Sequence, residues 1–225
     1  MKKIKFSEAK LLIEEGDILL FRGKGMASWF IRKASHGLYT HVGIASFSNG
    51  NKETSILECV EFREGSFIAS LFNKNAGGGG RAVNLKLQVD AFPGQIDVYR
   101  PVPYFASWLY NEDKKDVLLS RRKFNGKLVT RTMRQMTGLP YGWKRIIWMA
   151  KRNLAVIRVF YGEEDLVSDT FKEIIYPVCS TAIAYSFSKN GYDLIPNRSD
   201  EFTQPSNIAN SSRLSYLFTL TNDAV

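Results

Sequence analysis

The chain has 225 residues, of which 44% are hydrophobic and 13% aromatic, and a formal net charge of +9 at pH 7. This length is enough to bury one substantial core, and two cysteines are too few for a disulfide framework. The sequence has no signal-peptide pattern and no long apolar run, so we expect a single domain in the cytoplasm without a transmembrane segment.

The first part of the chain predicts a helix, a strand and a second helix. Residues 7–15 have amphipathic spacing, and Gly16 ends that helix. The apolar run at 17–21 then favours a strand. Residues 26–34, with apolar side chains at helical spacing, indicate another helix that leads towards His36.

Two strands follow, and each carries a polar residue of interest. Residues 39–47 and 55–62 are rich in β-branched and aromatic residues, with His41 near the start of the first. In that strand, Gly43 permits a close backbone approach. Alternation places Glu58 on an apolar face of the second strand, where a carboxylate is costly unless it has a partner. A histidine on the neighbouring antiparallel strand would be that partner, whereas an edge position would leave Glu58 solvated.

Three other features of this region predict ordinary structural roles. His36 precedes Gly37 in a turn and lies off the strand pattern, which favours a surface histidine. Cys59 faces away from Glu58 by alternation, which indicates a core cysteine. The glycine run at 77–80 is typical of a loop tip, because no phosphate-loop lysine follows it.

The positive charge is concentrated in the third quarter of the chain. Residues 114–158 contain 13 Lys or Arg and one acid, Asp116. Residues 113–136 and 141–160 predict helices, and the second has an apolar stripe opposite a basic side. That side carries Lys144, Arg145, Lys151 and Arg152.

The basic side of the second helix has two interpretations. A core-packed helix with a solvated charged face is one, and contact with an anionic membrane surface or polymer is the other. A peripheral membrane location is therefore one expectation. Nucleic acid is not favoured as a partner, because no reading motif or stacking signature accompanies the charge.

Cys179 lies where a loop turns into a helix. Pro177 disfavours helix at the residue before it, and residues 180–187 have helical spacing. The cysteine thus falls in the first turn, where free backbone N–H groups and the helix dipole stabilise a thiolate. A nucleophilic role also needs a base, for which the chain offers His36 and His41. A buried, unreactive cysteine is the alternative.

Several short segments occur in an informative order. They are 16–19 (GDIL), 39–44 (YTHVGI), 57–58 (LE), 138–143 (GLPYGW), 178–185 (VCSTAIAY) and 204–211 (QPSNIANS), the last leading to a final strand at 214–220. Together they resemble the circularly permuted papain-like cysteine hydrolases of the NlpC superfamily, in particular the YiiX-like branch, in which the histidine strand precedes the cysteine helix. The chain departs from that pattern at Thr181, where Gly or Glu is common, at Gln204, where Thr is common, and over most of 104–176.

The resemblance implies an α+β fold, in which an antiparallel sheet packs on the cysteine helix. A single catalytic domain would span 1–225, with a basic helical insertion at about 104–176. Cys179 would be the nucleophile, His41 the general base and Glu58 the residue that orients the imidazole.

The same resemblance implies a hydrolase that cleaves an amide, ester or thioester bond. Peptidoglycan peptides and lipid acyl groups are the substrates that related branches suggest. The backbone N–H of Cys179 and the Tyr141 hydroxyl would stabilise the oxyanion, with Ser180 and Tyr39 beside the substrate.

Two other function classes remain open from the sequence. An acyltransferase would use the same three residues with an acceptor in place of water, and a non-catalytic module would use the basic insertion to bind a membrane or polyanion. We predict no cofactor. Zinc is disfavoured, because the two histidines and two cysteines form neither a Cys-x-x-Cys pair nor a helical His pair.

Overall fold

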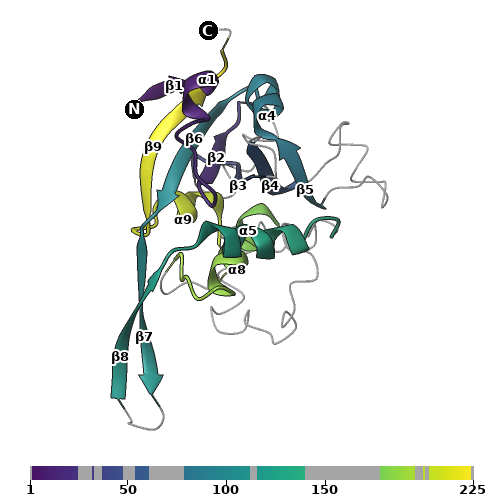
Figure 1. Ribbon diagram of the computed structural model, residues 1–225. Helices are drawn as coiled ribbons and strands as arrows, with labels where there is room; N and C mark the ends of the chain where they lie inside the picture. Colours follow the sequence, from purple (N-terminus) through teal and green to yellow (C-terminus); the bar gives the residue numbers. More distant parts are fainter. Residues whose placement is uncertain are drawn as a thin grey trace, which may run out of the picture.

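A seven-stranded sheet is the centre of the fold, seen in a computed structural model of the chain (Figure 1). The structure describes residues 2–24, 32, 37–47, 54–60, 79–111, 116–139, 178–195, 200 and 203–223. The strand order is β1-β9-β6-β2-β3-β4-β5, and all neighbours are antiparallel except β1 and β9. The strands are β1 (Lys3–Lys5), β2 (Ile18–Arg22), β3 (His41–Phe47), β4 (Thr54–Val60), β5 (Gly79–Asn84), β6 (Gln95–Pro101) and β9 (Leu214–Thr221).

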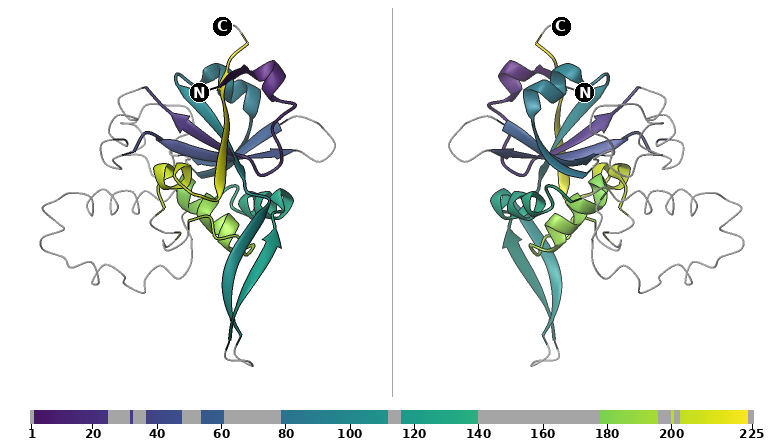
Figure 2. Two further views of the ribbon diagram at one scale, coloured as in Figure 1. Left: turned by 90° about the vertical axis from the view of Figure 1, so that its left-hand side faces the viewer. Right: turned by 90° about the vertical axis from the view of Figure 1, so that its right-hand side faces the viewer.

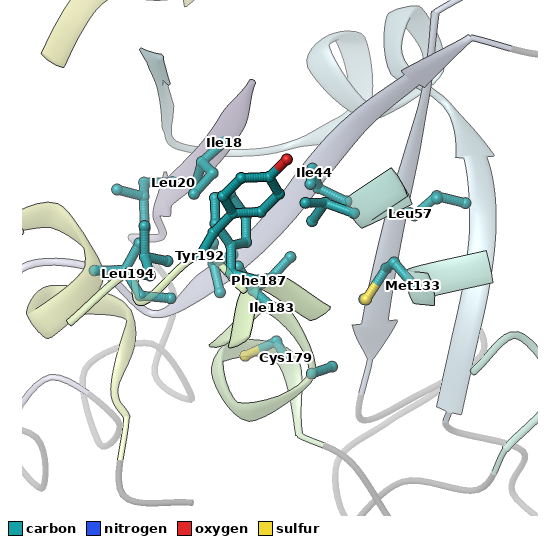
Figure 3. Packing of buried hydrophobic residues seen from close by; sticks show 14 of the residues in the cluster. Ile18, Leu20, Ile44, Leu57, Met133, Cys179, Ile183, Phe187, Tyr192 and Leu194 are labelled. Atoms are coloured by element: carbon teal, nitrogen blue, oxygen red, sulfur yellow. The ribbon is translucent and has the colours of Figure 1, made fainter. Parts of the chain in front are cut away.

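Helices cover both faces of this sheet. On one face lie α1 (Phe6–Ala9) and α4 (Leu85–Ala91), and on the other α5 (Gly126–Gln135) and α8 (Cys179–Ser188) (Figure 1). Strand alternation supplies both cores, since Ile18 and Leu20 of β2 pack towards α8 while Leu19 and Phe21 pack towards α4. Figure 3 shows the α8 side of the core. The predicted α+β fold with an antiparallel sheet against the cysteine helix is thereby confirmed.

A long hairpin extends away from the sheet (Figure 2). It consists of β7 (Tyr104–Asn111) and β8 (Asp116–Lys123), which pair along their whole length. The predicted helix at 113–136 was therefore wrong in its first half, and α5 begins only at Gly126. The apolar and basic residues of β8 have no decisive period by themselves, and pairing with the aromatic-rich β7 makes them a strand.

The other predicted elements have mixed outcomes. The strands predicted at 17–21, 39–47 and 214–220 are confirmed with small shifts of their ends. The strand predicted at 55–62 is confirmed as far as residue 60, and residues 61–62 lie outside the described part of the chain. The first helix is shorter than predicted: α1 ends at Ala9, and the chain continues as turns through residue 12. After these turns the Asp17 carboxylate accepts a hydrogen bond from the Glu14 N–H. The predicted helix at 141–160 lies outside the described residues, as does most of the one at 26–34.

Gly79 and Gly80, predicted as part of a loop tip, begin β5 instead, because they pair with Val60 and Cys59 of β4. Residues 81–101 were not assigned from the sequence, yet they supply the rest of β5, the helix α4 and the strand β6. Of these, β6 lies between β2 and β9 and joins the N-terminal strands to the C-terminal strand. Within the part of the chain that is described, no helix is both long and apolar enough to cross a membrane.

Candidate active site

The start of α8 holds Cys179 in a defined position. Val178 has the extended backbone of an N-cap residue, and Cys179 is the first residue of the helix. The Thr181 hydroxyl accepts the Val178 N–H at 3.1 Å, the reach-back bond that a glutamate makes in a capping box. Thr181 thus performs the capping role at the position where the sequence departs from the family pattern. The cysteine is 6% exposed and packs on the α8 side of the core (Figure 3).

His41 and Glu58 meet across two adjacent strands. Glu58 pairs with Gly43 in the sheet register, two residues from His41. The His41 Nε2 and Glu58 Oε2 atoms are 2.7 Å apart. Glu58 is fully buried and the His41 side chain is 19% exposed. The edge position that would have left Glu58 solvated is excluded, and the predicted histidine partner is present.

Gly43 leaves room for this diagonal contact. A Cβ atom at this position would lie 2.4 Å from Ile56 Cγ2 and 3.5 Å from Glu58 Cβ. Any side chain here would push on Ile56 and on the strand that carries Glu58. The absence of a side chain at Gly43 is therefore part of how the site is built.

We expect Gly43→Ala to lower the free energy of unfolding by about 1–3 kcal/mol, the usual cost of overpacking a core. The added methyl group forces Ile56 aside and shifts Glu58 relative to His41. Urea unfolding measures the loss, and iodoacetamide alkylation of Cys179 shows whether the site is disturbed as well. Wild-type stability in the variant would show that the strands yield freely and that Gly43 is not required.

Cys179 and Glu58 both affect the pKa of His41. Burial opposes the imidazolium, but the hydrogen bond to Cys179 and its charge, followed by those of Glu58, raise the pKa of His41 to about 10. Since Nε2 binds Glu58, Nδ1 is the ring nitrogen left for the thiol. Burial also opposes the ionised Glu58, yet His41 and then Arg81 lower its pKa overall. An imidazolium beside a carboxylate is therefore the neutral-pH state of the pair.

Arg81 is a third charged residue of the site, and we did not predict it. Its Nε and Nη2 atoms lie 2.9 and 2.8 Å from Glu58 Oε1. It follows the glycine run and lies on β5, which was not recognised as a strand. The register that places it opposite Glu58 exists only in the assembled sheet.

Tyr39 and Ser180, predicted beside the substrate, use their hydroxyls inside the protein. The Tyr39 hydroxyl donates to Asp97 Oδ2 at 2.8 Å, and burial, then Tyr99 and Asp97, raise the pKa of Tyr39. The Ser180 hydroxyl donates to the Thr203 carbonyl at 2.6 Å. In this arrangement both residues anchor the site's backbone.

The segment at 204–211 connects the two halves of the site. It contains the short helix α9 (Pro205–Ala209). In this helix the Ser206 hydroxyl oxygen accepts a hydrogen bond from the Tyr39 backbone N–H at 3.4 Å. The carbonyl of Thr203, the residue before this segment, accepts a hydrogen bond from the Ser180 hydroxyl. This turn thus touches both the strand entry that leads to His41 and the helix that begins with Cys179.

Several predicted residues lie outside the described part of the chain. These are His36, Tyr141 and the basic residues Lys144, Arg145, Lys151 and Arg152, and the side chain of Cys59 is not described either. Of the basic residues that are described, Arg121, Arg122, Lys123, Lys127 and Arg131 are exposed on β8 and α5. In the described residues no group of three or more His, Cys, Asp or Glu side chains is placed to hold a metal ion.

Comparison with known proteins supports the fold. The chain matches no protein family and no curated protein. Among solved structures it resembles metalloprotein YiiX from Escherichia coli O157:H7, with a TM-score of 0.52 and 13% sequence identity. The match covers 91% of this chain and 96% of the other. The chain therefore has an α+β fold similar to that of YiiX.

Proposed function

We propose that the chain is a cysteine hydrolase of the NlpC superfamily with a circularly permuted papain-like fold. The observation that carries the proposal is the 2.7 Å contact between His41 and the buried Glu58, together with the electrostatic effect of Cys179 on the pKa of the same His41. A thiol at a helix start, an imidazole and a buried carboxylate are the components of acyl transfer by a cysteine nucleophile. The similarity to YiiX over most of both chains supports the fold on which this proposal depends.

In the proposed mechanism His41 holds the proton of the Cys179 thiol, and the sulfur attacks the acyl carbon of the substrate. The developing oxyanion accepts a hydrogen bond from the backbone N–H of Cys179 at the start of α8. His41 then gives its proton to the leaving group, and an acyl-enzyme thioester remains. Water, deprotonated by His41, attacks the thioester and releases the acid and the thiol.

Glu58 supports this proton transfer by its position. Its Oε2 fixes the tautomer and the plane of the imidazole ring, and its charge stabilises the imidazolium. Because His41 has a pKa of about 10, it is protonated throughout the neutral range and ready to protonate a leaving group. The role of Glu58 is thus to orient and stabilise His41.

YiiX is described as a metalloprotein, which raises the question whether His41 and Glu58 could hold a metal ion in this chain. The residues present do not fit one. Both Glu58 oxygens already have partners, Oε2 with His41 and Oε1 with Arg81. The positive charge of the Arg81 guanidinium would also repel a metal cation bound to this carboxylate. The proposed reaction therefore uses the side chains and backbone of this chain.

The acyl donor is proposed from the resemblance as a peptidoglycan peptide or a lipid acyl group. The three residues serve hydrolysis and acyl transfer alike, because the thioester reacts with whichever acceptor reaches it. Product analysis with and without an added amine or alcohol separates these two outcomes.

Acyl-enzyme formation tests the proposal directly. We expect p-nitrophenyl acetate at pH 7 to release a burst of nitrophenol and to leave one acetyl group on Cys179, located by mass spectrometry of peptides. Cys179→Ala abolishes the burst. The matched variant Cys59→Ala, which removes the other cysteine, retains it. Equal acetylation of both cysteines, or a burst that survives in Cys179→Ala, would refute the nucleophile assignment.

A further inference from the structure

Arg81 lies directly opposite Glu58 in the sheet. The two residues are register partners between β5 and β4, so their side chains project from the same face. Both guanidinium contacts go to Oε1, which leaves Oε2 to His41. The two oxygens of one buried carboxylate are thus divided between a permanent cation and a titrating one.

The strand that carries Arg81 is held in place by the turn that follows α5, at residues 136–139. The Gly80 N–H donates to the Leu139 carbonyl at 3.0 Å, and the Gly138 N–H donates to the Gly80 carbonyl at 2.8 Å. A Cβ atom on Gly80 would lie 2.1 Å from the Met136 carbonyl oxygen, so the two backbones are in direct contact. These backbone contacts therefore fix the position of the strand from which the Arg81 side chain extends to Glu58.

Several charged or titratable groups on the packed elements have partners other than Glu58. On α4, Lys86 and Asp90 pair with each other at 2.7 Å. On α5, Arg134 donates to the Phe47 carbonyl. On α8, Cys179 faces His41 rather than the carboxylate. Among the described residues, Arg81 and His41 are the groups whose charges act most strongly on Glu58.

We propose that Arg81 is a positioning residue, which keeps the Glu58 carboxylate ionised and turned towards His41 throughout the reaction. This inference rests on the proposed function. When His41 passes its proton to a leaving group, Glu58 faces a neutral imidazole, and a buried carboxylate without a cation is costly. Arg81 supplies a cation that does not titrate, so the carboxylate retains its charge and its orientation.

The test is the rate of Cys179 alkylation by iodoacetamide between pH 4 and 9, with peptide mapping, in wild type, Arg81→Gln and Arg81→Lys. Loss of a positive charge raises the pH at which the neighbouring groups release their protons. We therefore expect the acid limb of the Arg81→Gln profile to move up by about one pH unit. Arg81→Lys retains the charge and restores most of that shift. Arg81→Met removes the same charge and replaces Arg81→Gln if the latter does not fold.

Arg100 offers a matched control. Its Nε and Nη2 atoms bind the buried Asp17 at 2.9 and 2.8 Å, and its side chain is 31% exposed, as is that of Arg81. The partners of Arg100 are Asp17, Glu14 and the Leu12 carbonyl, and neither His41 nor Glu58 is among them, so Arg100→Gln breaks a similar ion pair and lowers stability without moving the profile. An Arg81→Gln profile that coincides with wild type, while Glu58→Gln moves it, overturns the inference and leaves the proposed function intact. A wild-type Cys179 that reacts no faster than Cys59 refutes the proposed function itself.

Discussion

His41→Ala is expected to slow the alkylation of Cys179 by iodoacetamide at pH 6 by about two orders of magnitude. In the wild type the His41 imidazolium faces the Cys179 sulfur, and the His41 pKa of about 10 keeps that positive charge in place across the acid and neutral range. Without it, Cys179 reacts as an ordinary thiol, whose thiolate is less than about 1% of the total at pH 6. Stopped-time alkylation with mass-spectrometric mapping of the cysteine peptides gives both rates.

The same experiment defines the alkaline side of the profile. Wild-type reactivity is expected to stay nearly constant up to the pH at which His41 loses its proton, whereas the variant becomes reactive only as an ordinary thiol ionises. His36→Ala is the matched control, because it removes the other histidine, and it should follow the wild type. Profiles for His41→Ala and wild type that coincide would exclude His41 as the base.

Glu58→Gln is expected to lower the free energy of unfolding at pH 7 by about 3 kcal/mol, as found when one partner of a buried ion pair is removed. Glu58 is fully buried between Arg81 and His41, and a neutral amide offsets neither charge. Urea unfolding of the two proteins measures the difference. Asp90→Asn, which breaks the exposed Lys86–Asp90 pair, is the control and should cost less than about 1 kcal/mol.

The pH dependence of that difference follows from the direction of each shift. The pKa of Glu58 is lowered by folding, so its contribution is present above the unfolded value of about 4.3 and disappears as the pH falls through the folded pKa. The pKa of His41 is raised, so its contribution is complete below about 6.5 and is lost as the pH rises towards 10. The stability difference should therefore be largest near neutral pH and should narrow in acid. A difference that is the same at pH 3 and pH 7 would contradict the ionised, paired Glu58.

The pairing of Glu58 with a histidine and the position of Cys179 could be inferred from short stretches of the sequence. The alternation in 55–62 places Glu58 on an apolar face, and a buried carboxylate requires a cation or donor, which made a histidine on the adjacent strand the natural partner. In the same way, Pro177 followed by helical spacing predicted a helix beginning at Cys179. Both inferences depend on residues close together in sequence or on neighbouring strands.

The sequence by itself thus determined the strands at 17–21, 39–47, 55–60 and 214–220 and the cysteine helix, because hydrophobic period is a local property, and it offered His41 as one possible partner of Glu58. Only the tertiary structure decided that 116–123 is a strand, since β structure requires a partner, and that Arg81 faces Glu58, since register is set by the whole sheet. It likewise decided that the Tyr39 hydroxyl binds Asp97, a residue 58 positions away. Contacts between distant segments leave no periodic trace in the chain, and they are formed when the sheet assembles.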